Sequence, residues 1–190
     1  FFVRYSARML VARSGHRRTL SAFLACVMLL CGAPTPVSAA PAAAGVRPGI
    51  AVFLDDVPAA LRGKRVGLIT NNTGIDRSGT SDIDLIAASD DLTLVALLAP
   101  EHGIRGTAEA GVTVGDGVDA KTGVPVYSLY GAQGHSPTPA MLKDVDVLVY
   151  DLQEVGGRTW TYVSTMALSM QAAARKGIPF VVLDRPNPIG

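Results

Sequence analysis

Acidic, basic and amide side chains of this 190-residue sequence gather in short segments that directly follow apolar stretches. The densest segment, at 100–106, carries Glu101, His102 and Arg105. A carboxyl group at the end of an apolar strand is partly desolvated, which raises its pKa toward the range of a general acid. Glu101 is therefore our first candidate for an acid catalyst, and the alternative is a surface ion pair with Arg105. His102 either orients this carboxylate or caps a turn.

A second acidic group follows the apolar stretch at 145–150 and consists of Asp151 and Glu154. Glycosidases place two carboxyl groups beside the scissile bond, one as acid and one as base or nucleophile. Asp151, Glu154 and Asp184 each qualify as the partner of the first candidate. We predict Glu101, Asp151 and Glu154 as the catalytic set. The alternative for Asp151 is structural, because negative charge also stabilises the start of the helix expected after it.

The same loops offer groups that can recognise a substrate. Arg105 and Arg158 can each bind a carboxylate through the planar fork of the guanidinium. The amides of Gly156 and Gly157 precede an expected helix, where they either hold an anion or simply form a tight turn. Aromatic side chains such as Tyr130 either stack on a sugar face or belong to the core. The predicted substrate-binding set is Asn71, His102, Arg105, Tyr130, Arg158, Asp184, Arg185 and Asn187.

These loops alternate with segments that have the patterns of strands and helices. Nearly continuous apolar stretches are typical of strands buried on both faces of a parallel sheet. They predict strands at 65–70, 92–98, 124–129, 145–151 and 180–183. Helices are expected at 81–88, from Thr138 onward and at 162–176, the last ending at Gly177. This alternation predicts an α/β fold, a Rossmann-like parallel sheet flanked by helices, in which ligands bind beyond the carboxyl ends of the strands.

Several other classes of function lack their sequence signals. The sequence has no glycine-rich dinucleotide fingerprint, no phosphate-binding P-loop, no Gly-x-Ser-x-Gly and no His-Glu-x-x-His. Both cysteines, Cys26 and Cys31, precede residue 40, so the chain after them has no cysteine-based metal site, and without a His-Glu-x-x-His motif we predict no metal site. Five arginines also precede residue 40, and without them 12 basic residues face 16 acidic ones, a net charge of −4. An acidic body of this kind argues against nucleic acid as a partner.

The first residues have the order of an export signal. Arg17 and Arg18 precede an apolar stretch at 20–30 that is short for a membrane span, and small residues follow up to Ala39. We therefore expect a signal peptide at 1–39, a linker at 40–48 and an exported protein without a stable membrane span. The alternatives are an anchor that stays in place, or a lipid on one of the two cysteines.

Five blocks in series resemble one bacterial family. They lie at 68–74, 100–106, 125–131, 146–156 and 183–190, and they cover roughly residues 49–190. The family was long described as a domain of unknown function and is now typified by the exo-β-N-acetylmuramidase NamZ. The chain departs from it in small ways, for instance with Asn72 where Pro is common and Glu154 where Asp is common.

The resemblance implies a Rossmann-like N-terminal catalytic domain, here 49–190, followed by a smaller C-terminal domain that this chain lacks. It implies an exo-acting glycoside hydrolase that releases terminal N-acetylmuramic acid from peptidoglycan fragments without a cofactor. The family's catalytic Glu matches Glu101 in the Pro-Glu-His-Gly block. Because a Rossmann-like layer hosts many functions, the alternatives are a sugar-binding module of the cell wall and an amide or ester hydrolase acting on muropeptides. The sequence predicts no oligomeric state.

Overall fold

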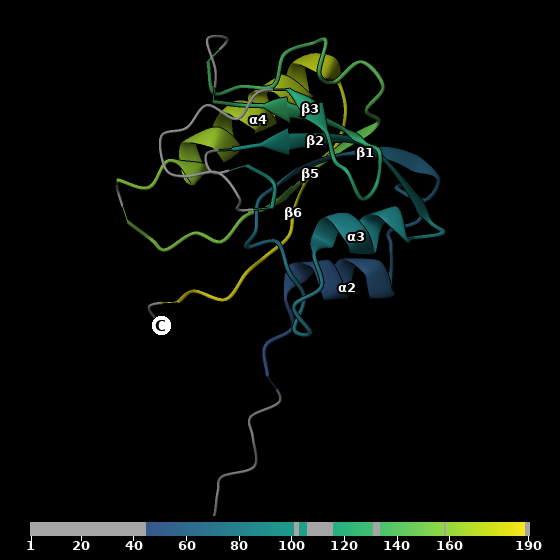
Figure 1. The fold of residues 1–190 in the computed structure, drawn as a ribbon, viewed down its shortest axis with the longest axis vertical. Helices are drawn as coiled ribbons and strands as arrows, with labels where there is room; N and C mark the ends of the chain where they lie inside the picture. The colour runs from purple at the N-terminus through teal and green to yellow at the C-terminus, as the bar shows by residue number, and fades with distance from the viewer. Residues whose placement is uncertain (1–44, 101–102, 106–115, 131–133, 158, 189–190) are drawn as a thin grey trace, which may run out of the picture. The chain divides into compact units, whose positions relative to one another are not determined.

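The computed structural model describes residues 45–100, 103–105, 116–130, 134–157 and 159–188. Within them, three helices and six strands are present (Figure 1). The elements are α2 (Gly49–Asp55), β1 (Lys64–Thr70), α3 (Asp82–Ala87), β2 (Leu92–Ala99), β3 (Gly117–Val118), β4 (Pro125–Ser128), β5 (Val147–Asp151), α4 (Tyr162–Lys176) and β6 (Phe180–Val182).

The six strands form one sheet in the order β3-β4-β2-β1-β5-β6, and every pairing except that of β3 with β4 is parallel. Counted along the chain, the five parallel strands are arranged 3-2-1-4-5, which is the order of a Rossmann-like sheet. The predicted fold class is therefore confirmed, and each predicted strand overlaps an observed one. The strands that follow β1 in the chain lie first on one side of it, as β2 and β4, and then on the other side, as β5 and β6. The strand order thus reverses at the β1–β5 junction, which is where ligands bind in such folds.

The sheet is covered on both faces, which explains why its strands are apolar throughout (Figure 1). Val147 and Val149 of β5 belong to the core on one face, together with residues of α2 and α3. Leu148 and Tyr150 point to the other face and pack with residues of α4. Alternate side chains of one strand thus enter two cores, and neither face tolerates a polar residue in the middle of the strand.

The two helices predicted at 81–88 and 162–176 are confirmed, the second with its predicted end at Gly177. The Ser81 hydroxyl caps α3 by accepting from the amide of Ile83. Gly177 ends α4 in the left-handed conformation, at φ 75°, while Arg175 and Lys176 lie in the last turn next to the helix carbonyl groups. No helix within the described parts of the chain is long and apolar enough to cross a membrane.

Two features differ from the prediction. The segment from Thr138 is not a helix but a series of turns, in which Lys143 donates to the carbonyl of Ala140 and Val145 to that of Leu142. These bonds span three residues instead of four, and β5 begins too soon afterwards for a regular helix to develop. The sequence interpretation also missed α2, because its short apolar segment lacks a capping side chain: Pro48 occupies the N-cap position.

Candidate functional site at the strand ends

The polar loops that follow β1, β5 and β6 come together at one edge of the sheet. Thr70 at the end of β1 pairs in register with Asp151 at the end of β5. Gln153 then joins two of the loops, because its side-chain amide donates to the carbonyl groups of Glu154 (2.8 Å) and Pro186 (2.9 Å). The predicted gathering of these loops at the carboxyl ends of the strands is therefore confirmed for the parts that the structure describes.

Asp151 is engaged in a buried ion pair with Arg185. The guanidinium donates to both carboxylate oxygens, at 2.5 Å and 2.9 Å, and the side chains of Arg185 and Asp151 are only 8% and 0% exposed. Burial raises the pKa of Asp151, and the hydrogen bonds from Arg185 oppose this shift. The interpretation of Asp151 as a helix cap is wrong, because α4 begins only at Tyr162 and has no acid in its first turn.

Arg185 also connects this pair to the loop that follows β1. Its two terminal nitrogens each lie 3.2 Å from the carbonyl oxygen of Ile75 and donate to it. Among the described residues, the Arg185 guanidinium thus donates to Asp151 and to Ile75. Asp151 and Arg185 therefore form a buried pair that fixes the loops at the site, and Arg185 also lines the pocket described below.

Asp82 is a buried carboxyl group at this edge that the sequence interpretation missed. It is 0% exposed, one oxygen lies 2.5 Å from the hydroxyl of Thr70, and the other accepts from the amide of Ile83 at 2.7 Å. Burial, and next the charge of Asp151, raise the pKa of Asp82 to about 8. Gly74 packs so closely that an added Cβ would lie 2.3 Å from an Asp82 oxygen. In the sequence, an acid directly after a capping serine is typical of an ordinary helix start. The nearby Gly74 is therefore the one sequence feature that indicates close packing against Asp82.

The predicted substrate-binding residues Asn71 and Tyr130 hold the start of α4. The amide of Asn71 donates to the hydroxyl of Tyr162 at 2.9 Å, while its oxygen accepts from the amide of Thr73 at 2.8 Å. The hydroxyl of Tyr130 donates to that of Thr161 at 2.8 Å. Side chains from two separate loops thus bind the side chains at the start of α4, whose N-cap residue Thr161 makes no side-chain capping bond.

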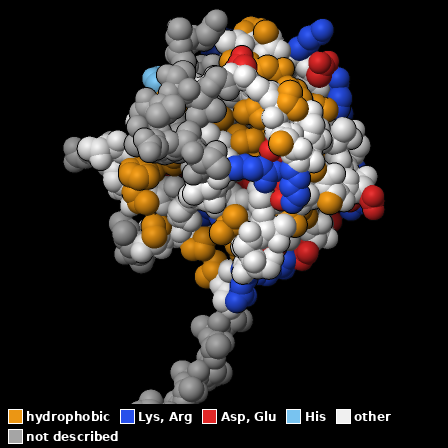
Figure 2. Space-filling view, viewed as in Figure 1, with side chains coloured by type: hydrophobic (Ala, Val, Ile, Leu, Met, Phe, Trp, Pro, Cys, Tyr) orange, Lys and Arg blue, Asp and Glu red, His pale blue; other side chains and the backbone are white. Residues whose placement is uncertain are grey.

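Arg105 lies in a separate ionic cluster. Its guanidinium donates to both oxygens of Asp119, at 2.7 Å and 2.9 Å, and to Asp84 at 3.1 Å. These hydrogen bonds raise the pKa of Arg105, and the bond from Arg105 lowers that of Asp119. The guanidinium of Arg105, one of the groups expected to bind a substrate carboxylate, is therefore already bonded to Asp119 and Asp84. On the face shown in Figure 2, basic groups likewise appear singly or beside acidic ones.

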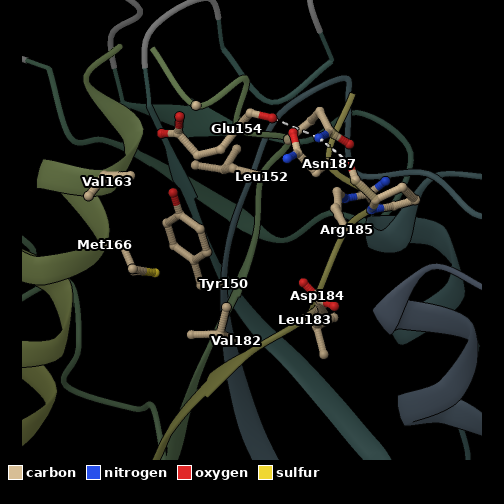
Figure 3. Close-up of a pocket in the computed structure, with 13 residues that line it drawn as sticks. Tyr150, Leu152, Glu154, Val163, Met166, Val182, Leu183, Asp184, Arg185 and Asn187 are labelled. Atoms are coloured by element: carbon tan, nitrogen blue, oxygen red, sulfur yellow. Dashed lines mark hydrogen bonds between the residues drawn. The ribbon is translucent and has the colours of Figure 1, made fainter. Parts of the chain in front are cut away.

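A pocket of about 280 Å³ opens between the ends of β5 and β6 and the first turns of α4. Figure 3 shows the Glu154 carboxylate on the same side of this pocket as Tyr150 and Val163. One oxygen of Glu154, Oε1, is buried and has no hydrogen-bond donor among the described residues. The residues lining the pocket are Tyr150, Leu152, Gln153, Glu154, Gly156, Val163, Met166, Val182, Leu183, Asp184, Arg185, Pro186 and Asn187.

The predicted site residues thus fall into four groups. Glu154, Asp184 and Asn187 line the pocket, whereas Asn71, Tyr130 and Arg105 are bonded to other protein groups. Asp151 and Arg185 form a buried pair, of which Arg185 also lines the pocket. Glu101, His102 and Arg158 lie outside the described residues. No cluster of three side chains suited to a metal ion occurs within the described ranges.

Residues 66–190 match the family described as exo-beta-N-acetylmuramidase NamZ, N-terminal. The chain belongs to this NamZ family. It is 50% identical over 181 residues to the peptidoglycan beta-N-acetylmuramidase NamZ of Bacillus subtilis (strain 168), an alignment that covers 92% of this chain and 43% of the relative. The chain therefore spans less than half the length of that NamZ protein.

Two crystal structures of DUF1343 family proteins from Bacteroides fragilis have the same fold. One is 52% identical with a TM-score of 0.68, covering 76% of this chain and 35% of the other. The second is 33% identical with a TM-score of 0.61, covering 76% of this chain and 36% of the other. Both extend well beyond the segment that is shared with this NamZ family member.

Proposed function

We propose that this protein is an exo-acting glycoside hydrolase that releases terminal N-acetylmuramic acid from peptidoglycan fragments. The observation that carries the proposal is the 50% identity to the NamZ of Bacillus subtilis over 92% of this chain. The site supports the same conclusion, because a carboxylate faces a pocket at the carboxyl ends of parallel strands, next to the point where the strand order reverses.

Glu101 is the proposed general acid and Glu154 the proposed second carboxyl group. Glu101 follows β2 in the sequence block that matches the family's catalytic Glu. Among the acids at the β5 end, Glu154 is favoured over Asp151, because Asp151 is fully buried and neutralised by Arg185. A carboxylate that is held by two hydrogen bonds from one guanidinium is poorly suited to attack or to transfer a proton.

Arg158 is the residue proposed to bind the lactyl carboxylate, the group that distinguishes N-acetylmuramic acid from N-acetylglucosamine. Of the three arginines in the strand-end loops, Arg105 and Arg185 are each bonded to aspartates. Arg158 follows two glycines whose amides precede α4, a position that favours an anion. Of the two arginines that the sequence offered for this role, Arg105 and Arg158, the proposal therefore keeps Arg158.

We also propose that the protein is exported, with cleavage after Ala39. The support is the order of arginines, apolar stretch and small residues in the first 39 positions. Amino-terminal sequencing of the protein from the extracytoplasmic fraction should give a chain that starts at Ala40. A chain from that fraction that still carries residues 9–39 would contradict this proposal.

The deciding experiment is incubation of the full-length protein with muropeptides whose glycan chain ends in N-acetylmuramic acid. Release of free N-acetylmuramic acid, or of a chromogenic group from its β-glycoside, is the expected result. Binding without release would favour a sugar-binding module of the cell wall. Release of peptides instead of the sugar would favour an amide hydrolase, and release of acetate from O-acetyl groups would favour an ester hydrolase. Either of these results would refute the proposed glycosidase.

A further inference from the structure

The pocket beside Glu154 combines apolar walls with one buried acceptor. Tyr150 and Leu152 come from β5 and the loop after it, and Val163 and Met166 come from the first turns of α4 (Figure 3). Between them lies Oε1 of Glu154, which is buried without a donor among the described residues. A buried carboxylate oxygen without a hydrogen bond is costly, so a group that enters this pocket gains most by supplying a donor.

The donors next to Glu154 are already used within the protein. The hydroxyl of Tyr150 donates to the carbonyl of Tyr162 at 2.9 Å. The side-chain amide of Gln153 donates to two backbone carbonyls, those of Glu154 and Pro186. Burial raises the pKa of Tyr150, and the charge of Glu154 raises it further, so this phenol stays neutral. None of these groups donates to Oε1, so a molecule that binds in the pocket can supply the donor that the described residues do not.

We propose that this pocket is the subsite for the N-acetyl group of the sugar, an inference that rests on the proposed function. The amide N–H of the sugar donates to Oε1 of Glu154, and the methyl group packs against Met166 and Val163. An N-acyl group carries a donor and an apolar group two bonds apart, which is the combination that these walls offer. A hydroxyl group would supply the donor alone, and an ammonium group would have to lose its hydration against apolar side chains.

The size of the pocket agrees with a subsite for part of a saccharide. Its volume of about 280 Å³ is just below the range of roughly 300–1,000 Å³ that is usual for the site of a whole small ligand. Val163 is 53% exposed and Val182 is 49% exposed, so the pocket has apolar rims that a bound sugar would cover. The rest of the sugar would extend from the pocket toward the ends of the neighbouring strands.

The first experiment isolates the N–H. Binding of N-acetylmuramic acid and of its 2-O-acetyl analogue, which keeps the methyl and carbonyl groups but lacks the N–H, is measured by calorimetry on the full-length protein. The wild type should bind the amide about 10–100-fold more tightly, the range for a hydrogen bond to a charged group. Glu154→Ala should remove this preference by weakening the amide far more than the ester. Equal weakening of both, in a variant with unchanged circular dichroism, would overturn the proposal.

The second experiment tests the apolar wall and does not alter the carboxylate. Met166→Ala enlarges the pocket, so the ratio of binding between the N-butanoyl and the N-acetyl sugar should rise about tenfold or more, because the longer chain can then enter. Met170→Ala is the matched control, since Met170 lies one turn further along α4 and is 47% exposed without lining the pocket. An unchanged ratio in Met166→Ala, or the same rise in both variants, would overturn the proposal.

These outcomes separate the subsite from the proposed reaction. If the protein binds the N-acetyl sugar with these preferences but releases no muramic acid, the subsite stands and the glycosidase is refuted. If the protein releases muramic acid but neither variant changes the preference for the acyl group, the glycosidase stands and the subsite is refuted.

Discussion

Replacement of Asp82 by asparagine should change how the stability of this domain depends on pH. Asp82 has an ordinary pKa of 3.8 in the unfolded chain and a pKa of about 8 in the folded protein. The folded state therefore binds one proton more than the unfolded state between these two pH values. Stability that depends on this group is fully present below about pH 4 and is lost as the pH rises toward about 8.

The magnitude follows from the separation of the two pKa values. Each pH unit within the window removes about 1.4 kcal/mol of stability, so the change from pH 5 to pH 7 amounts to about 3 kcal/mol. In Asp82→Asn this loss is absent, because asparagine has no proton to release. The variant keeps the local bonds, since its oxygen can accept from Ile83 and its NH₂ can donate to Thr70, whose hydroxyl then donates to the carbonyl of Asn71, 3.2 Å away.

The measurement is native-state hydrogen exchange of the segment that contains β1 and α3, followed by mass spectrometry. It reports the free energy of opening of this region in the full-length protein, independently of the stability of other regions. Comparison of variant and wild type at each pH cancels the intrinsic pH dependence of exchange. The exposed Asp90→Asn is the control and should run parallel to the wild type. A constant difference between Asp82→Asn and the wild type from pH 5 to pH 7 would refute the reasoning.

Three further predictions concern the site. Glu101→Gln should lower the release of muramic acid by about 10²–10⁴-fold with unchanged circular dichroism; activity within a few-fold of the wild type would remove Glu101 as the acid. Arg158→Ala should lower kcat/KM for muramyl substrates by the equivalent of about 2 kcal/mol more than for glucosaminyl analogues. Arg105→Ala should lower the urea midpoint of unfolding and reduce kcat/KM for both substrates alike. The reverse pattern would assign carboxylate recognition to Arg105. Asp151→Asn should destabilise the domain by about 3–5 kcal/mol in thermal unfolding, because it leaves the buried Arg185 without a counter-charge; an unchanged midpoint would contradict the assigned ion pair.

The sequence by itself determined the type of fold and the edge of the sheet at which the site lies. The strands could be recognised because both faces of a parallel sheet are covered, which requires apolar residues throughout, as in β5. The end of α4 was recognisable because Gly177 alone can provide the left-handed residue there without strain. Such signals are local, since each depends on residues that are neighbours in the chain.

The tertiary structure decided which polar side chains remain available for chemistry. Asp151 looked like a catalytic acid or a helix cap, and its partner Arg185 comes from a loop that follows a different strand. Arg105 looked like a carboxylate receptor, and Asp119, which occupies it, comes from the loop before β4. Ionic and hydrogen-bonding partners are chosen by distance in space and by burial, neither of which a spacing along the chain records. Glu154 differs from these residues because the fold turns it toward a pocket. There, none of the described residues donates a hydrogen bond to its buried oxygen.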